Sequence, residues 1–205
     1  MAYGGENQIV LAGWGGAAGR PDEPFGSKLN RILVQRFQID ASEQMAPADT
    51  TVETANTKKL TLGAALIMPG DRLHVHGWGA VTASNAAAEI TTRLRLGGLT
   101  GVELAVIAGY DAVDADHHEW DAWLWFEAVG AATPTTPTSK FHSRGRGWRT
   151  GGSDERTVVK DNQTLSTLAA LDIVATQDWS TNNAGNRFKL YELSAELYRT
   201  RQTWG

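Results

Sequence analysis

The fold is decided by the run Trp120-Asp121-Ala122-Trp123-Leu124-Trp125-Phe126-Glu127-Ala128-Val129, in which two kinds of side chain alternate. Successive side chains of a β-strand point to opposite faces of its sheet. One face of this run is wholly apolar and must be buried. The other mixes carboxylates with indoles, so it is neither plain core nor plain solvent face. The run predicts a central strand whose outer face carries Asp121, Trp123, Trp125, Glu127 and Val129.

The composition favours one soluble, β-rich globular protein. The 205 residues are 41% hydrophobic and 20% charged, enough for one large β-domain or two small ones, and the 22 glycines favour many short strands. Cysteine is absent, which excludes disulfides and thiolate metal sites. A net charge of −4 argues against nucleic-acid binding. We find no secretory signal in Met1–Val10 and no apolar run long enough for a membrane helix.

Period-two patterns recur at roughly ten-residue spacing and predict eight to ten strands. Helical segments between them are missing, so we predict an all-β protein, an antiparallel β-sandwich of jelly-roll type. The run 102–108 is apolar enough for a strand buried on both sides, and 41–56 is expected to be a polar connection. The main expected strands are 32–39, 59–62, 72–81, 92–96, 102–108, 120–129, 171–176 and 188–200.

The first 27 residues differ from the rest of the chain. Glycine and proline punctuate them too densely for regular structure, so we predict an extended Gly-rich arm at 1–27 and a sandwich at 28–205, with its jelly-roll core at 58–205. The arm is either a disordered terminus or a segment that orders on a neighbouring subunit. Its apolar anchors are Ile9, Val10, Leu11 and Trp14.

Charge separates into two neighbouring segments. Residues 111–127 hold six carboxylates and no Lys or Arg, whereas residues 140–160 have a net charge of +4. We expect the two segments to pair, either between subunits or within one chain. The basic segment is expected to be a loop, and contact with a phosphate backbone or a glycan anion is its less favoured use. Its residues of interest are Arg144, Arg146, Trp148 and Arg149, facing Asp116 and Glu119.

Motifs for catalysis or metal binding are weak. His74 and His76 share a strand face, but the Gly and Glu spacing of a cupin metal site is not met, and a half-exposed strand face or a subunit contact is favoured. Residues 114–119 offer oxygen and imidazole ligands, but an EF-hand requires Gly where Glu119 stands and Glu where Trp125 stands. Nucleophile-elbow, phosphate-loop and dinucleotide motifs are missing. We therefore predict no enzyme, no cofactor and no metal site.

Tryptophan is frequent, with eight in the chain. Five of them fall at polar-face or loop positions, where an amphipathic ring suits a protein interface or stacking on a sugar. These five are Trp78, Trp123, Trp125, Trp148 and Trp179.

The order of features from Lys59 onward resembles that of phage virion jelly-roll proteins, namely capsid decoration (cement), head-spike and fibre-head domains. Residues 59–62 are followed by Pro69-Gly70-Asp71 opening a strand, by 92–98, by the Trp-bearing strand and by a closing strand with Glu192-Leu193. The resemblance covers roughly 150 residues and no catalytic motif. It implies a homotrimer attached to a virion by an N-terminal arm.

Two functions follow from this resemblance. The first is a capsid decoration or head-spike protein on the outer surface of the head, made in the host cytoplasm, which binds the major capsid protein and its own copies. The second is a tail-fibre, receptor-binding or lectin-like module that holds a host glycan through exposed Trp and the acidic loop. The expected subunit or capsid contacts are Ile9, Val10, Leu11, Trp14, Asp116, Glu119, Trp123, Trp125, Arg144, Arg146, Trp148 and Arg149.

Overall fold

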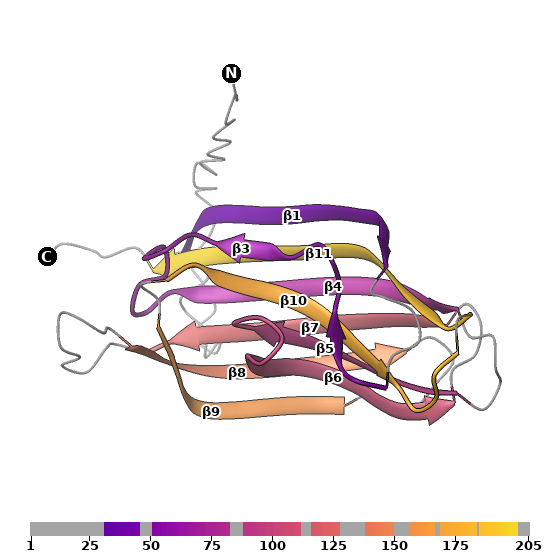
Figure 1. Ribbon diagram of the computed structural model, residues 1–205. Coiled ribbons are helices and arrows are strands. Elements are labelled where there is room, and N and C mark those ends of the chain that lie inside the picture. Colours follow the sequence, from indigo (N-terminus) through magenta and orange to yellow (C-terminus); the bar gives the residue numbers. More distant parts are fainter. Residues whose placement is uncertain are drawn as a thin grey trace, which may run out of the picture.

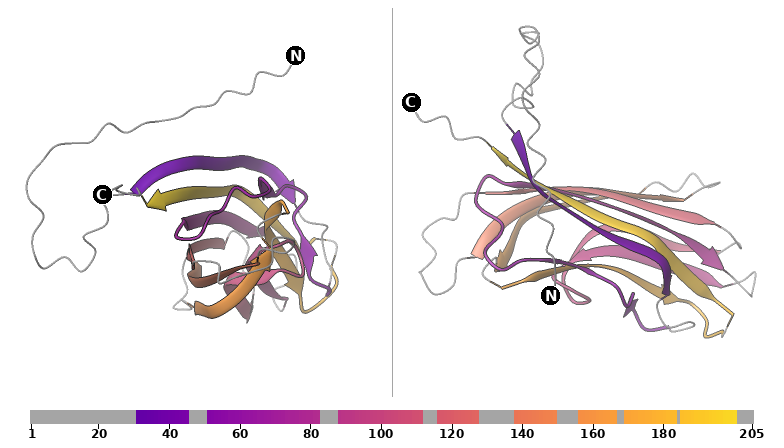
Figure 2. Two further views of the ribbon diagram at one scale, coloured as in Figure 1. Left: turned by 90° about the vertical axis from the view of Figure 1, so that its left-hand side faces the viewer. Right: turned by 90° about the horizontal axis from the view of Figure 1, so that it is seen from above.

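The computed structural model describes residues 31–45, 51–82, 88–111, 116–127, 138–149, 156–166, 169–183 and 185–200. These ranges form two antiparallel sheets that pack face to face, and the view from above in Figure 2 shows the two layers. The predicted all-β sandwich is thereby confirmed. The predicted arm, with Ile9, Val10, Leu11 and Trp14, lies outside the described residues.

The larger sheet has six strands, and its margins β1 and β9 lie at opposite sides of the sandwich (Figure 1). Its order is β1 (Arg31–Met45), β11 (Arg187–Thr200), β4 (Arg72–Thr82), β7 (His117–Phe126), β8 (Thr138–Arg149) and β9 (Arg156–Ser166). The smaller sheet runs β2 (Thr54–Ala55), β10 (Leu171–Trp179), β5 (Glu89–Leu96) and β6 (Val102–Asp111), and β3 (Leu60–Leu62) also pairs with β10.

The strand order is that of a jelly roll with one addition. The chain passes back and forth between the sheets, so that β1-β11-β4-β7 faces β2-β10-β5-β6. Two four-stranded sheets interleaved in this way are the jelly-roll arrangement. The hairpin β8–β9 then extends the first sheet beyond β7.

The Trp-rich strand has the two faces that its sequence predicts. Trp120, Ala122 and Leu124 are fully buried and Phe126 is 1% exposed, whereas Trp123 and Trp125 on the other face are exposed. The strand β7 begins earlier than predicted, at His117, and ends at Phe126. It lies between β4 and β8 near the middle of the larger sheet, with the core under its apolar face.

The predicted basic loop is wrong, because residues 144–149 belong to the strand β8 and are followed by a second strand, β9. In β8 the glycines Gly145 and Gly147 point inward and the larger side chains between them point outward. A Cβ on Gly145 would lie 1.9 Å from the carbonyl oxygen of Leu104, so only glycine lets β8 lie this close to β6. The glycines that resembled loop residues are packing residues.

Three further expectations need correction. The connection expected at 41–56 is shorter, because β1 continues to Met45 and β2 forms at Thr54–Ala55. The strand at 102–108 is buried on one face only, because a two-layer sandwich covers only the inner face of each sheet, and Val106 and Ala108 of β6 remain partly exposed. Trp179, expected at a polar or loop position, is 1% exposed at the end of β10.

The predicted strand at 188–200 is confirmed as β11, but its faces change along its length. An irregularity in the pairing with β4, between Leu190 and Glu192, moves Tyr191 out of the core face on which period two places it. Leu190 and Leu193 are both fully buried, with two residues between them instead of one. In the part of the chain that the structure describes, no helix is long and apolar enough to span a membrane.

Candidate binding face

The outer face of the six-stranded sheet gathers aromatic, histidine and carboxylate side chains, and we call it the aromatic face. Cross-strand register aligns its residues in rows, because residues paired across neighbouring strands point to the same side. One row pairs Glu196, His74, Trp123 and Arg144, and another pairs Glu192, Trp78, Glu119 and Trp148. The face comprises His74, His76, Trp78, Glu119, Asp121, Trp123, Trp125, Glu127, His142, Arg144, Arg146, Trp148, Tyr191, Glu192, Glu196 and Tyr198.

Two histidines of β4 hold two of the carboxylates that β7 contributes to this face. His74 Nε2 donates to Asp121 Oδ2 at 2.6 Å, and His76 Nε2 donates to Glu119 Oε1 at 3.0 Å. Each carboxylate lies one row along β7 from the residue that pairs directly with its histidine. The bonds fix the rotamers of the carboxylates and satisfy part of their hydrogen-bonding capacity.

His142 has a carboxylate at each ring nitrogen. Its Nδ1 lies 2.9 Å from Asp161 Oδ1 and its Nε2 lies 2.6 Å from Glu127 Oε1. Ionised carboxylates only accept, so this arrangement favours the doubly protonated ring, which can donate to both. The hydrogen bond from Asp161 and then that from Glu127 raise the pKa of His142 above its usual value.

The two exposed tryptophans of β7 lie flat on these rings. The Trp123 ring stacks on His74 with 4.2 Å between centroids and an interplanar angle of 12°, and it lies 6.0 Å from Tyr198. Trp125 stacks on His142 at 5.0 Å and 13°. The two tryptophans are 38% and 41% exposed. Each indole is therefore held in one orientation while part of its surface stays exposed.

A hollow of about 300 Å³ opens on the aromatic face where β7 begins. Trp78 of β4 and Trp148 of β8 are both directly paired with Glu119 of β7, so the two indoles flank that carboxylate. The Trp78 indole donates to Glu192 at 3.3 Å and stacks on Tyr191 at 4.7 Å. The walls of the hollow are His76, Trp78, His117, His118, Glu119 and Trp148.

The acidic and basic segments pair within one chain, one of the two arrangements expected from the sequence. Arg149 Nη1 lies 3.5 Å from Asp116 Oδ2, where the start of β7 lies beside the end of β8. Arg146 lies over the Trp148 ring, 5.9 Å from its centroid. The cationic strand β8 thus lies directly beside the acidic strand β7.

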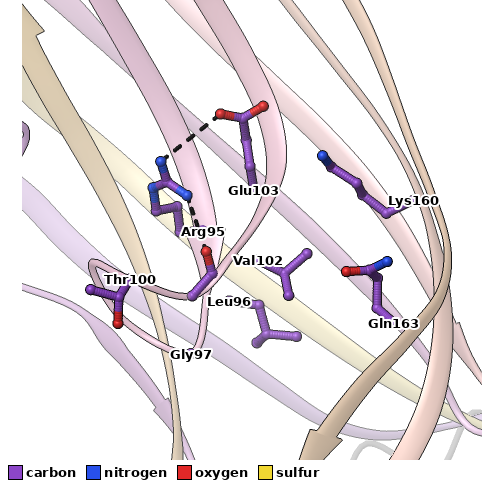
Figure 3. Close-up of a pocket in the computed structure, with 9 residues that line it drawn as sticks. Arg95, Leu96, Gly97, Thr100, Val102, Glu103, Lys160 and Gln163 are labelled. Carbon is purple, nitrogen blue, oxygen red and sulfur yellow. Dashed lines mark hydrogen bonds and ion pairs between the residues drawn. The ribbon is translucent and has the colours of Figure 1, made fainter.

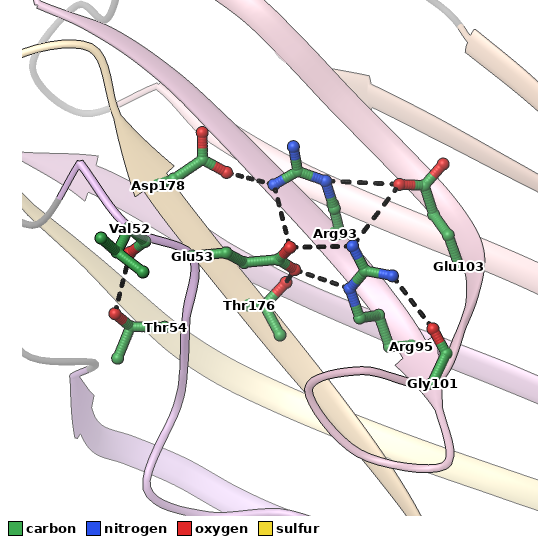
Figure 4. Close-up of polar contacts among 9 residues, drawn as sticks. All are labelled: Val52, Glu53, Thr54, Arg93, Arg95, Gly101, Glu103, Thr176 and Asp178. Carbon is green, nitrogen blue, oxygen red and sulfur yellow. Dashed lines mark hydrogen bonds and ion pairs between the residues drawn. The ribbon is translucent and has the colours of Figure 1, made fainter.

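The outer face of the smaller sheet has a different character, because its charges pair with one another (Figure 4). Arg95 binds both oxygens of Glu53, at 2.6 and 2.8 Å, and Arg93 pairs with Asp178 and with Glu103. Burial opposes ionisation of Glu53, but Arg95, Thr176 and Arg93 outweigh it and lower the pKa of this carboxyl. This network fastens the segment before β2 to the sheet.

A second hollow, of about 550 Å³, lies beside that network between the β5–β6 turn and β9 (Figure 3). Arg95 and Glu103 form one side, and Lys160 and Gln163 approach from the other. Arg95 is held by Glu53 and by the carbonyl of Gly101 at 3.0 Å. The residues around it include no aromatic ring, so this hollow lacks the stacking surface of the first.

The structure brings several predicted contact residues together. Asp116, Glu119, Trp123, Trp125, Arg144, Arg146, Trp148 and Arg149 all belong to β7, β8 or the residue before β7. Within the described ranges, no three His, Asp or Glu residues are placed to hold a metal ion.

Sequence reasoning did not assign His142, Tyr191, Glu192 and Tyr198 to this face. The Gly-X-Gly alternation of β8 is the signal that would have placed His142 outward.

No family model matches the chain, and no curated protein matches its sequence. Solved structures similar to it include the Lotus tetragonolobus seed lectin, at 7% identity and TM-score 0.41, covering 85% of this chain and 95% of the lectin. Winged bean acidic lectin matches at 9% identity and TM-score 0.31, and the match covers 82% of this chain and 99% of the lectin. The structure of infectious bursal disease virus, Gx strain, matches at 11% identity and TM-score 0.29, and the match covers 82% of this chain and 37% of the viral chain. At these values the likeness concerns the β-sandwich alone.

Proposed function

We propose that the chain is a non-enzymatic virion structural protein, a capsid decoration or head-spike protein, that binds its own copies and the major capsid protein through the aromatic face. The observation that carries this proposal is the pair Trp123 and Trp125, 38% and 41% exposed and each stacked on a histidine. Large, rigid aromatic rings on a flat face are the residues that dominate protein interfaces.

The polar groups around the two indoles favour association over solvation. Each carboxylate beside them already accepts a hydrogen bond from a histidine, as in His74–Asp121 and His142–Glu127. Covering such a face leaves few polar groups without a partner, which keeps the desolvation cost low. The imidazoles are bound to carboxylates side by side on the sheet, an arrangement for a fixed surface and not for activating a nucleophile.

Assignment to a virion is supported by the jelly-roll strand order together with the order of sequence features that resembles phage virion proteins. In this proposal the Gly-rich arm at 1–27 attaches the sandwich to the capsid. An antibody against the chain should label the outer surface of the head in purified virions. Labelling confined to the tail would contradict the decoration role.

Self-association is tested by size-exclusion chromatography with light scattering over a wide range of micromolar concentrations. The full chain should form an oligomer, and Trp123→Ala or Trp125→Ala should weaken it by about 2 kcal/mol, roughly thirtyfold in Kd. Thermal unfolding of the monomer should change little, because both rings lie on the surface.

The matched control is Leu99→Ala, a similarly exposed side chain in the turn before β6. It should leave the oligomer intact. A wild-type chain that stays monomeric, or a tryptophan variant that unfolds without dissociating, would refute the proposed role of this face.

A second candidate function is binding of a host glycan. It is favoured by the hollow between Trp78 and Trp148, where two indoles flank the carboxylate of Glu119. Aromatic walls with a few fixed polar groups are typical of small-ligand sites.

A further inference from the structure

The spacing of the strands that carry Trp78 and Trp148 leaves room for a single ring between them. The two residues stand two strands apart in one row, because both pair directly with Glu119. Neighbouring strands are about 4.8 Å apart, so the backbones that carry the indoles are separated by roughly 10 Å. A ring in van der Waals contact on both sides requires roughly 7–8 Å between the indoles. The hollow of about 300 Å³ lies at the small end of ligand sites.

The walls of this hollow are held in place before any ligand arrives. Trp78 is fixed by its stack on Tyr191 and by its hydrogen bond to Glu192. Glu119, whose side chain is 41% exposed, is fixed by His76 at 3.0 Å. A carboxylate has about four acceptor positions, so Glu119 can accept further hydrogen bonds from a ligand. Such preorganisation lowers the entropic cost of binding.

The charges around the hollow select a neutral ligand. Arg146 lies over the Trp148 ring, and Lys189 lies over Tyr191 at 5.2 Å, on the ring that supports Trp78. The positive charge of these two side chains opposes a cationic ligand in the hollow. Glu119 and Glu192 oppose an anionic one. A neutral ring with apolar faces and hydroxyl donors at its edge meets all of these constraints.

We propose that the hollow formed by Trp78, Glu119 and Trp148 binds one neutral pyranose unit of a glycan, with its C–H faces against the indoles and a hydroxyl donating to Glu119. This inference rests on the second proposed function and gives it a site. The site lies on β4, β7 and β8, and its Glu119 belongs to the acidic segment 111–127 that the sequence favours.

The test is titration of the full chain with the neutral methyl glycosides of glucose, galactose, mannose and N-acetylglucosamine, followed by tryptophan fluorescence and calorimetry. At least one glycoside should bind saturably. Trp148→Ala and Glu119→Gln should each weaken binding by roughly tenfold or more, with thermal unfolding used to confirm that both variants fold. At protein concentrations below assembly, where the aromatic face is open in both proteins, Trp123→Ala should bind as the wild type does.

Three results would overturn the proposal. They are the absence of saturable binding to every glycoside, binding that survives both Trp148→Ala and Glu119→Gln, and preferential binding of tetramethylammonium as a cationic probe. Because Trp123 lies outside the hollow, loss of sugar binding and loss of self-association are separable outcomes.

Discussion

His118 is a buried histidine between the two sheets. It is fully buried on β7, and its Nδ1 shares a 2.7 Å hydrogen bond with Thr92 Oγ1 of β5. Burial, with smaller effects of Arg149 and His117, lowers its pKa to about 3. The folded protein therefore holds a neutral imidazole that the unfolded chain protonates below pH ~6.5.

The sign of the resulting pH dependence is fixed by this lowered pKa. The contribution of His118 is fully present above pH ~6.5 and is lost as the pH falls toward the folded pKa, by up to about 1.4 kcal/mol per pH unit. We predict that His118→Gln makes the free energy of unfolding less dependent on pH between about pH 6 and pH 4. Urea denaturation at a series of pH values measures this slope.

Thr92→Val is the matched variant, since it removes the hydrogen bond and keeps the imidazole. It should lower stability while retaining the wild-type slope. Equal slopes for the wild type and His118→Gln would show that His118 is not protonated on unfolding in this range.

At the scale of single residues, the sequence predicts the faces of β7 well and the start of β11 poorly. Trp120 and Trp123 fall on their predicted sides because period two holds through the whole strand. Tyr191 does not, because the irregularity after Leu190 adds a residue that no local pattern announces. The partners of His142 were also out of reach, since Asp161 lies on a strand that was not predicted.

The β8–β9 hairpin is the element that turns a four-stranded jelly-roll sheet into the aromatic face. It supplies His142 beneath Trp125 and Trp148 opposite Trp78. The alternation of glycine with large polar residues hid it, because glycine and arginine in succession are typical of loops. The structure shows the reason for that pattern: Gly145 and Gly147 face the backbone of β6.

We predict that Gly145→Ala destabilises the fold by about 2 kcal/mol or more, because the added Cβ would meet the Leu104 carbonyl oxygen at 1.9 Å. Chemical denaturation provides the measurement. Gly63→Ala is the control, since a Cβ there has nothing within 4 Å and should change stability little. A neutral Gly145→Ala would mean that β8 does not pack against β6 as described.

The two outer faces of the whole molecule differ in what they leave for a partner. On the smaller sheet, Arg93 and Arg95 are engaged with Glu53, Glu103 and Asp178. On the larger sheet, aromatic rings lie open between carboxylates already bonded to histidines. The first arrangement holds a segment of the chain itself, whereas the second presents apolar area that association would remove from water.

The sandwich class was predictable from the sequence because alternation and turn residues recur over most of the chain. The assembly of the aromatic face was not, because it depends on which strands are neighbours. His74 lies far from β7 in sequence and meets it only through the jelly-roll order, whereas His142 reaches β7 through the added strand β8. Long-range pairing of this kind leaves no local trace in a single sequence.

The central claim is that the aromatic face is the surface buried on assembly, and thiol labelling tests it most directly. The chain has no cysteine, so Arg144→Cys beside Trp123 and Leu99→Cys on the turn before β6 each introduce a single reactive thiol. We predict that labelling of Arg144→Cys slows as the protein concentration rises through assembly, while Leu99→Cys reacts at a constant rate. Protection of Leu99→Cys instead, or equal rates at both sites throughout, would contradict the account.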